Sequence, residues 1–294
     1  MARSQFDALA EDYDAARPPY PEGVYQALED AAGPLAGKLV LEGGAGTGIA
    51  TRQLAASGAR IVAVDIAARM LRKAREHSPE ACFLLADANA VPLRDGCVDL
   101  ACFAQSWHWF SCDNAPREMA RVLRPGGFWA AWWNQEWADG EEWFDAYQSL
   151  LESACPGYDR RNRDARWADE RIDEIGLFES GTETEIPWTR TLSVAEWLTY
   201  ERSKSYVGRM PAADRDRLLS QIGDIAVGRF PDGRMSVRHC TRLRMARRRL
   251  SSPSLSLTPP RRAAAASRRA HRTERGRTRA GSPAGRAASA RTAP

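Results

Sequence analysis

The chain has 294 residues, 44% of them hydrophobic, which is enough for one large core or two small ones. Its formal net charge of +4 is unevenly distributed: residues 251–294 contain ten Arg and one acidic residue, leaving 32 basic and 37 acidic residues before them. This mildly acidic body argues against a broad nucleic-acid-binding face. No run of roughly 18 apolar residues is present that could span a membrane.

The first thirty residues contain two helical segments that are separated by prolines. Phe6–Asp14 has a helical pattern, Arg17-Pro18-Pro19-Tyr20-Pro21 follows, and the helical pattern resumes over Glu22–Leu28. Proline breaks a helix because it lacks an N–H group and clashes with the preceding turn. We therefore expect residues 1–32 to form a pair of N-terminal helices ahead of the main domain.

The clearest motif is a short apolar run, residues 39–41, that leads through Glu42 into alternate glycines and then into a helical pattern. Glycine adopts positive φ values and has no Cβ atom, so a ligand can lie directly against the main chain. The loop differs from the dinucleotide fingerprint G-x-G-x-x-G, but reading from Gly43 yields a degenerate form of it, so a nicotinamide dinucleotide stays an alternative. Glu42 favours a cationic ligand, because a carboxylate repels phosphate. The glycines of the loop are Gly44, Gly46 and Gly48.

Beyond this loop, apolar and helical stretches alternate along the chain. Such alternation predicts an α/β fold with a parallel sheet and helices on both of its faces. Ligands in these sheets bind beyond the carboxyl ends of the strands, so side chains at those ends should converge on one crevice. Strands are expected at 39–43, 60–65, 82–87, 97–103 and 127–133, and helices at 48–57, 67–77 and 113–123. The side chains at the strand ends are Glu42, Asp65, Asp87 and Gln105.

Four stretches, in this order and at plausible spacing, resemble the motifs of class I S-adenosylmethionine-dependent methyltransferases: Glu42–Gly48, Ile61–Asp65, Leu84–Ala88 and Arg121–Gly127. The similarity is to the small-molecule branch that includes ubiquinone-type and trans-aconitate-type enzymes. It implies a doubly wound, mostly parallel seven-stranded, Rossmann-like sheet with helical cap insertions, and a cofactor-binding core over residues 33–135. Gly43 departs from the usual apolar residue at its position.

The resemblance also implies S-adenosylmethionine as the cofactor. By this resemblance, Asp65 would accept hydrogen bonds from the ribose hydroxyls. Asp87 and Ala88 would contact adenine, and Met70 would cover the adenine ring. Their alternatives are a helix N-cap for Asp65, a plain turn for Asp87 and a core position for Met70. The cofactor-binding residues expected in this way are Tyr13, Arg17, Glu42, Gly44, Gly46, Gly48, Asp65, Met70, Asp87, Ala88 and Gln105.

The segment 105–110 would stand where methyl donor and acceptor meet. His108 is the candidate catalytic residue, since a neutral imidazole could take a proton from an acceptor hydroxyl or amine. A structural histidine is the alternative, because an in-line displacement needs alignment more than a strong catalytic group. The segment lacks an N-P-P-Y run, which argues against an amino-directed DNA or protein methyltransferase. We expect no metal.

Residues 136–250 are expected to supply a helical cap and the last two strands of the sheet. The stretch 134–181 has a helical pattern rich in Trp and acidic residues, whereas 182–192 alternates like a strand. Ser193 and Glu196 form a capping box. A helix over 211–227 precedes a last strand over 234–247, so the sheet should end in an antiparallel hairpin. In the cap, Lys204 could face an acidic acceptor or be solvated.

From Ser251 onward the composition changes to Ser, Pro, Ala and Arg, and we expect residues 251–294 to be disordered. Six cysteines without a C-x-x-C pair, and an N-terminus without an apolar stretch, predict a cytoplasmic protein with reduced thiols. The expected function is methyl transfer to a small metabolite. A non-catalytic binding protein with the same fold and a nicotinamide-dependent oxidoreductase are the alternatives. Nucleic acid could bind only through the basic tail.

Overall fold

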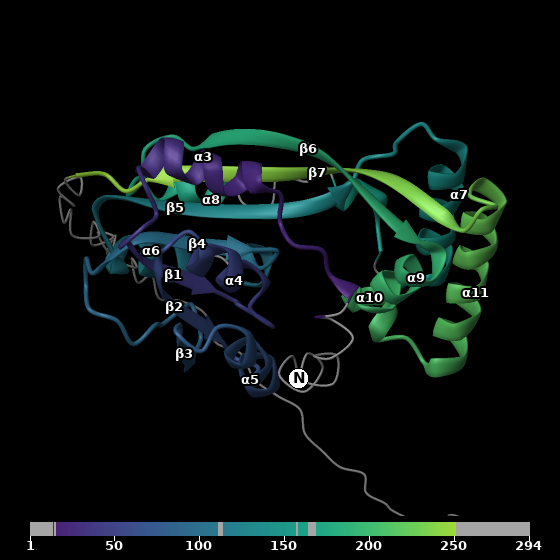
Figure 1. Ribbon diagram of the computed structural model, residues 1–294. Coiled ribbons are helices and arrows are strands. Elements are labelled where there is room, and N and C mark those ends of the chain that lie inside the picture. The colour runs from purple at the N-terminus through teal and green to yellow at the C-terminus, as the bar shows by residue number, and fades with distance from the viewer. Residues whose placement is uncertain (1–13, 15, 111–113, 157, 164–168, 251–294) are drawn as a thin grey trace, which may run out of the picture. The chain divides into compact units, whose positions relative to one another are not determined.

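The computed structural model describes residue 14 and residues 16–110, 114–156, 158–163 and 169–250 (Figure 1). The expectations for Tyr13 and for the tail from residue 251 lie outside these ranges.

One seven-stranded sheet organises the described part of the chain, in the order β3-β2-β1-β4-β5-β7-β6 (Figure 1). Strands β1 to β5 are parallel to one another, and β7 is antiparallel to both β5 and β6. The doubly wound, mostly parallel sheet and its antiparallel edge are therefore confirmed. The strands are β1 Leu39–Gly43, β2 Arg60–Asp65, β3 Cys82–Leu85, β4 Val98–Ala104, β5 Leu123–Glu136, β6 Thr182–Ser193 and β7 Arg234–Arg247.

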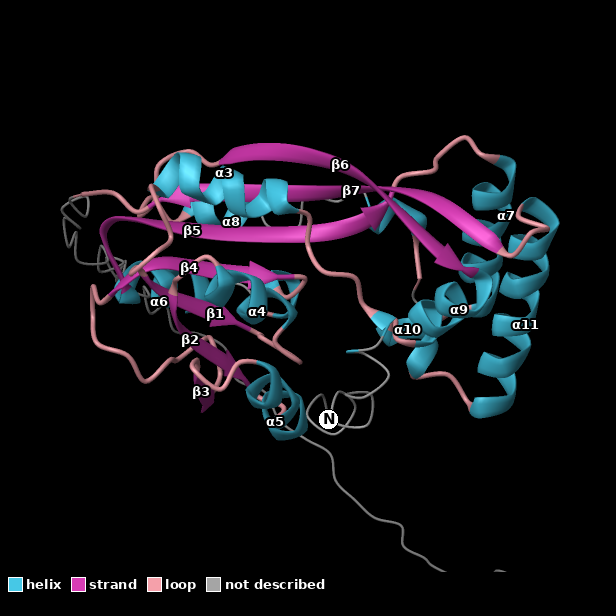
Figure 2. Ribbon diagram, viewed as in Figure 1, coloured by secondary structure: helices cyan, strands magenta, loops and turns pink. Residues whose placement is uncertain are grey.

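Alternating side chains of the strands fill two separate cores, one on each face of the sheet. Within β1, Val40 belongs to the core that contains Leu28 and Leu54, whereas Leu41 belongs to the core that contains Met119. Successive residues of a strand point to opposite faces, so a strand covered on both sides has to be apolar throughout. Helices α3, α4 and α5 thus cover one face, and α6 and α8 cover the other (Figure 2).

The helices of the described part are short and mostly fall where the sequence predicts them. They are α3 Glu22–Ala32, α4 Ile49–Ala56, α5 Ala68–His77, α6 Asn114–Val122, α7 Glu142–Ala154, α8 Asp169–Glu174, α9 Val194–Arg202, α10 Ser205–Gly208 and α11 Ala212–Arg229, with 3₁₀ turns at Trp107–Trp109 and Arg160–Arg163. None of these described helices is both long and apolar enough to cross a bilayer.

Three strand boundaries differ from the sequence expectation by two residues or more. Strand β5 begins at Leu123 rather than at residue 127. Strand β3 ends at Leu85 rather than at residue 87, so Asp87 lies in the loop that follows it. Strand β5 continues to Glu136, so the helical expectation is wrong for residues 134–136. The reason is long-range: Trp133 to Glu136 pair with residues 242–239 of β7, and that partner is a hundred residues away in the sequence.

A third core joins the cap helices to the far ends of β6 and β7. It combines Trp143 of α7, Trp197 of α9 and Ile222 of α11 with Leu192 of β6 and Val237 of β7. The capping box at the start of α9 is present: the Glu196 N–H donates to Ser193 Oγ at 3.2 Å, and the Ser193 N–H donates to Glu196 Oε2 at 2.7 Å. The cap is therefore packed directly onto strands of the sheet.

Candidate active site

The glycine loop after β1 has the left-handed backbone that its sequence predicts. The φ angles of Gly44, Gly46 and Gly48 are 67°, 57° and 81°. A Cβ atom on Gly48 would lie 2.9 Å from the Cβ of Ala74 in α5, whereas a Cβ on Gly46 would meet nothing within 4 Å. Gly48 therefore lets α4 approach α5 closely, and Gly46 presents bare main chain to a ligand.

Gly43 at the end of β1 is explained by one neighbour. A Cβ atom there would lie 2.2 Å from Cε1 of Phe103, which points across from β4. The Ser106 hydroxyl donates a hydrogen bond of 2.6 Å to the Gly43 carbonyl. The end of β1 is thus held against β4 and the residues that follow it. In the sequence, the glycine at position 43 was the feature that indicated this close approach.

Glu42 is a carboxyl group enclosed in the sheet, with 1% of its surface exposed. Burial raises its pKa to about 8, because the charged form loses its hydration. The Thr51 hydroxyl, which donates to Glu42 Oε2 at 2.5 Å, and Arg52 lower the pKa, while Asp65 raises it further. A cationic ligand beside Glu42 would favour the ionised carboxylate and so bind better when Glu42 loses its proton.

Asp65 holds the loop and the next helix together. Its Oδ2 accepts a hydrogen bond from the Gly46 N–H at 2.9 Å, and its Oδ1 accepts one from the Ala67 N–H at 2.8 Å. The second contact closes the turn before α5. The N-cap residue of that helix is Ala67 and no side chain caps it, so the N-cap alternative for Asp65 is wrong.

The remaining residues expected at the adenine end lie in and after β3. Asp87 is exposed, and its Oδ1 accepts hydrogen bonds from the main-chain and side-chain nitrogens of Asn89 at 2.9 and 2.8 Å. Ala88 and Met70 are buried, with exposed fractions of 1% and 2%. Because β1 to β4 are parallel, Asp87 lies at the same edge of the sheet as Glu42 and Asp65.

Gln105 follows β4 directly and is, among the described residues other than glycine, the one with a positive φ, 55°. Its N–H donates to the Trp132 carbonyl at 2.8 Å, and its Nε2 donates to the Asn134 carbonyl at 3.1 Å. Strained backbone of this kind concentrates at functional sites, where the surrounding structure holds it in place. Gln105 therefore connects the carboxyl end of β4 to the extended end of β5.

His108 lies in the 3₁₀ turn after Gln105. Its Nδ1 accepts a hydrogen bond from Trp133 Nε1 at 3.2 Å, and burial lowers its pKa to about 4. The imidazole is therefore neutral near pH 7. A Nδ1 that accepts a hydrogen bond carries no proton, so the proton of the neutral ring is on Nε2.

Residues 14 and 16–20, called the strap below, connect the glycine loop to the cap. Asp14 accepts hydrogen bonds of 3.1 Å from the guanidinium of Arg52 in α4. Three residues later, the Arg17 guanidinium lies 5.2 Å from the centre of the Tyr200 ring in α9 and donates to the Ser203 carbonyl at 3.4 Å. The structure thus places Arg17 against the cap.

The cap contains a buried charge cluster that the sequence reading did not identify. Lys204 Nζ lies 2.7 Å from Glu136 Oε1 and 2.8 Å from Glu201 Oε1, and it donates to the Tyr147 hydroxyl at 2.9 Å. Arg202, its neighbour in the sequence, is exposed. Lys204 is therefore inside the cap but already paired with two carboxylates.

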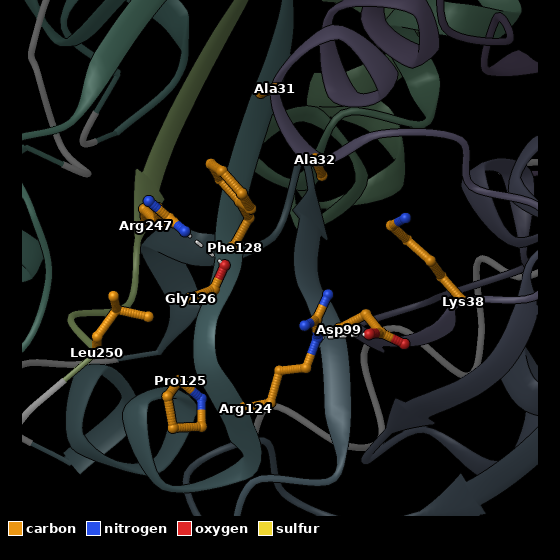
Figure 3. A pocket seen from close by; sticks show the side chains of 10 residues that line it. All are labelled: Ala31, Ala32, Lys38, Asp99, Arg124, Pro125, Gly126, Phe128, Arg247 and Leu250. Atoms are coloured by element: carbon orange, nitrogen blue, oxygen red, sulfur yellow. Dashed lines mark hydrogen bonds and ion pairs between the residues drawn. The ribbon is translucent and has the colours of Figure 1, made fainter.

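An open pocket of about 520 Å³ lies at the opposite edge of the sheet (Figure 3). Lys38 immediately precedes β1 and Asp99 is near the start of β4, so this pocket is at the amino ends of the strands. Arg124 closes part of it through an ion pair of 2.6 Å with Asp99. It is separate from the glycine loop and plays no part in the site described above. Its lining residues are Ala31, Ala32, Lys38, Asp99, Arg124, Pro125, Gly126, Phe128, Arg247 and Leu250.

The site at the carboxyl edge fits a cationic nucleoside better than a pyrophosphate. Asp65 lies close enough to Glu42 to raise its pKa, and Asp65 accepts a hydrogen bond from the open main chain at Gly46. A phosphate would add its negative charge to that of Asp65 and raise the pKa of Glu42 further, whereas a sulfonium with ribose hydroxyls supplies a positive charge and hydrogen-bond donors. No group of three or more His, Cys, Asp or Glu able to hold a metal ion occurs within the ranges that the structure describes.

Comparisons with known proteins show the family of the chain. The family model described as a methyltransferase domain matches residues 41–131, which span the glycine loop to β5. An uncharacterized methyltransferase-like protein of Schizosaccharomyces pombe is 32% identical over 222 residues, covering 73% of this chain and 83% of that protein. An uncharacterized methyltransferase of Mycobacterium tuberculosis is 32% identical over 217 residues, covering 74% and 83%.

A solved structure shows the same fold. The protein, from Anaeromyxobacter dehalogenans and described as a type II methyltransferase, superposes with a TM-score of 0.59 at 24% identity, covering 81% of this chain and 99% of that one. The glycine loop, its acidic neighbours, the sheet order and the relatives all lead to one assignment: the chain belongs to the S-adenosylmethionine-dependent methyltransferases.

Proposed function

We propose that this enzyme transfers the methyl group of S-adenosylmethionine to a small-molecule acceptor that it encloses between the glycine loop and the cap. The observation that carries this proposal is the strap. Asp14 contacts Arg52 beside the loop, and Arg17 contacts Tyr200 and Ser203 in the cap, so one short segment connects both sides of the site. An enclosed site suits a small acceptor, because enclosure excludes water and aligns the reacting atoms.

The cofactor supplies a methyl group that is already activated by the positive sulfur, so the protein has to bind, orient and desolvate. Glu42 would offset the positive charge, and Gly44, Gly46 and Gly48 would let the main chain approach the ligand. Asp65 would accept hydrogen bonds from the ribose hydroxyls. Asp87, Ala88 and Met70 would surround the adenine, and Gln105 would border the acceptor.

In this proposal His108 is a hydrogen-bond donor and not the general base that its position in the sequence suggested. With its Nδ1 occupied by Trp133 and its proton on Nε2, the ring offers a donor where a base would need an acceptor. We infer that His108 positions a group through an Nε2–H bond. Proton removal, where the acceptor needs it, would fall to another residue.

Other features bear on partners and location. The acidic body before residue 251 disfavours a nucleic-acid substrate. Five cysteines of the described part are free thiols, which supports a reducing compartment, and we infer that the enzyme acts in the cytoplasm.

The experiment is incubation of the full chain with methyl-labelled S-adenosylmethionine and a metabolite extract. The wild-type enzyme and the Glu80→Gln variant, an exposed position with the same change of charge, should label a small molecule. At a limiting cofactor concentration, Asp65→Asn should label it at least about tenfold more slowly. Label found in protein or nucleic acid would contradict the small-molecule proposal. Retained S-adenosylhomocysteine binding without any labelled product, over a broad extract, would favour the non-catalytic alternative.

A further inference from the structure

Strands β5, β6 and β7 continue beyond the carboxyl end of β4 towards the cap helices (Figure 1). The last residue of β4, Ala104, pairs with Trp132, while β5 runs on to Glu136 and remains paired with β7. We call residues 133–136, 237–241 and 186–190 the overhang. It adjoins the active site because Gln105, which follows β4, donates to the Asn134 carbonyl.

One face of the overhang is polar although it is largely buried. Cross-strand register places Asn134 beside Thr241 and Glu136 beside His239, and alternate residues of a strand share a face. Most of these groups are paired: Thr241 Oγ1 donates to Asn134 Oδ1 at 2.6 Å, and Lys204 Nζ donates to Glu136 Oε1 at 2.7 Å. Trp188 of β6 stacks on His239 with ring centres 4.5 Å apart.

His239 has one ring nitrogen engaged and one without a partner. Its Nδ1 lies 3.0 Å from the Val237 carbonyl, which can only accept, so the proton is on Nδ1 and Nε2 is a hydrogen-bond acceptor. Burial is the main cause that lowers the pKa of His239, so the ring is neutral near pH 7. Nε2 is buried and makes no hydrogen bond to any residue in the described part.

Among the described residues, Arg190 of β6 has a buried hydrogen-bond donor without a partner, whereas His239 has a buried acceptor without one. Its Nη2 donates to the Ala16 carbonyl of the strap at 3.1 Å, whereas its buried Nη1 has no hydrogen-bond partner within the described part of the chain. Arg190 is paired with Val237, two residues from His239, so the two side chains are diagonal neighbours on one face. Buried polar groups without partners cost stability, and such exceptions in a folded protein require an explanation.

We propose that His239 Nε2 and Arg190 Nη1 form a binding site for the methyl acceptor, which carries an O–H or N–H group next to a carboxylate. The hydroxyl or amine would donate to His239, and the carboxylate would accept from Arg190. This inference rests on the proposed function, since the acceptor is the ligand. Both nitrogens are buried in this structure, and the strap contacts Arg190 through the Ala16 carbonyl. The strap must therefore move outward from Arg190 for the ligand carboxylate to accept from Nη1 and, in place of the Ala16 carbonyl, from Nη2.

The neighbouring charges are compatible with such a ligand. Glu136, the carboxylate beside His239 in the register, is paired with Lys204. The rings of Trp188 and Tyr200 provide flat apolar walls next to the two nitrogens: Trp188 stacks on His239, and Tyr200 lies 5.2 Å from the Arg190 guanidinium. A planar, partly apolar acceptor with both polar groups on one side matches this arrangement.

The test uses three probes with the full chain saturated by S-adenosylhomocysteine: 2-hydroxybenzoate, benzoate, which lacks the hydroxyl, and phenol, which lacks the carboxylate. Calorimetry should show 2-hydroxybenzoate binding at least about tenfold more tightly than either partial probe. In His239→Phe, which keeps the stacking on Trp188, 2-hydroxybenzoate should bind no better than benzoate. In Arg190→Met, which keeps the aliphatic stem, it should bind no better than phenol.

Histidine ¹⁵N NMR of the wild-type chain provides a readout that needs no variant. The Nε2 resonance of His239 should shift on addition of 2-hydroxybenzoate and stay unchanged with benzoate. Equal affinities for the three probes, no binding of 2-hydroxybenzoate, or a site that holds only an ordered water would overturn the assignment of the pair. If S-adenosylhomocysteine still binds in that case, the methyltransferase function stands; if it does not bind, the proposed function itself fails.

Discussion

The pKa of Glu42 predicts how cofactor affinity depends on pH. With a pKa of about 8, about one tenth of the Glu42 carboxyl groups are ionised at pH 7 and about nine tenths at pH 9. A cation bound beside Glu42 lowers its pKa in the complex, so binding at pH 7 releases a proton and affinity rises with pH until Glu42 is fully ionised. The expected gain between pH 7 and pH 9 is about tenfold, or about 1.4 kcal/mol.

The assay is titration calorimetry with S-adenosylmethionine, whose sulfonium carries the positive charge, in two buffers of different ionisation enthalpy so that proton release is measured directly. The amino group of the ligand also titrates in this range, so the ratio of wild-type to Glu42→Gln affinity is the informative quantity. That ratio should rise about tenfold from pH 7 to pH 9. Glu80→Gln, exposed and outside the site, should follow the wild type at every pH.

Stability should change in the opposite direction. The pKa of Glu42 in the folded chain is raised above its unfolded value of 4.5, so the stability it contributes is present at low pH and is lost as pH rises through about 8. Linkage predicts that the free energy of unfolding of the free enzyme falls by about 2–3 kcal/mol between pH 6 and pH 9 relative to Glu42→Gln. The reasoning would be refuted if the ratio of wild-type to Glu42→Gln affinity stayed constant with pH and binding released no proton. Glu42 would then not be a buried, protonated acid that ionises when a cation binds.

Three further substitutions test the surroundings of the site. Gly43→Ala would place a Cβ atom 2.2 Å from Phe103 and should lower the free energy of unfolding, measured in urea, by about 1–3 kcal/mol. In the double variant, Phe103→Leu should relieve this loss; additive losses would contradict the contact. Asp65→Asn exchanges one acceptor oxygen for a donor facing the N–H of Gly46 or Ala67, so S-adenosylhomocysteine should bind at least about tenfold more weakly by calorimetry, and an unchanged affinity would argue against the role of this carboxylate. Lys204→Met leaves Glu136 and Glu201 buried without their cation and should cost about 3–5 kcal/mol; thermal unfolding within 1 °C of the wild type would show that water or protonation replaces the lysine.

Much of the site was visible in the sequence because its signals are local. The run from Glu42 to Gly48 shows a strand, a turn and a helix start within ten residues, and each requires particular residue types at particular steps. Asp65, Asp87 and Gln105 could be placed at one edge of the sheet because parallel strands end together. The additional contact of Asp65 with the Gly46 N–H could not be predicted, since it depends on how closely the loop approaches β2.

Contacts between distant segments were not predictable in this way. Lys204 was expected either to face the acceptor or to be solvated, and only the folded chain shows it between Glu136 and Glu201. His108 was assigned from its place after β4, but its tautomer depends on Trp133, which reaches it from another strand. Side-chain pairing of this kind depends on strand register and packing between distant segments, so a short stretch of sequence does not reveal it.

The sequence by itself therefore determined the α/β class, the positions of the parallel strands along the chain, the glycine loop and the acidic residues at the strand ends, because hydrophobic period, glycine and capping residues act over a few positions. Only the tertiary structure decided the length of β5, the strap between loop and cap, and the polar face on which His239 and Arg190 lie. These features come from the pairing of β5 with β7 and of β7 with β6. Phe128 and Arg247, for example, are paired across 119 residues of sequence, and the register is set by the whole core.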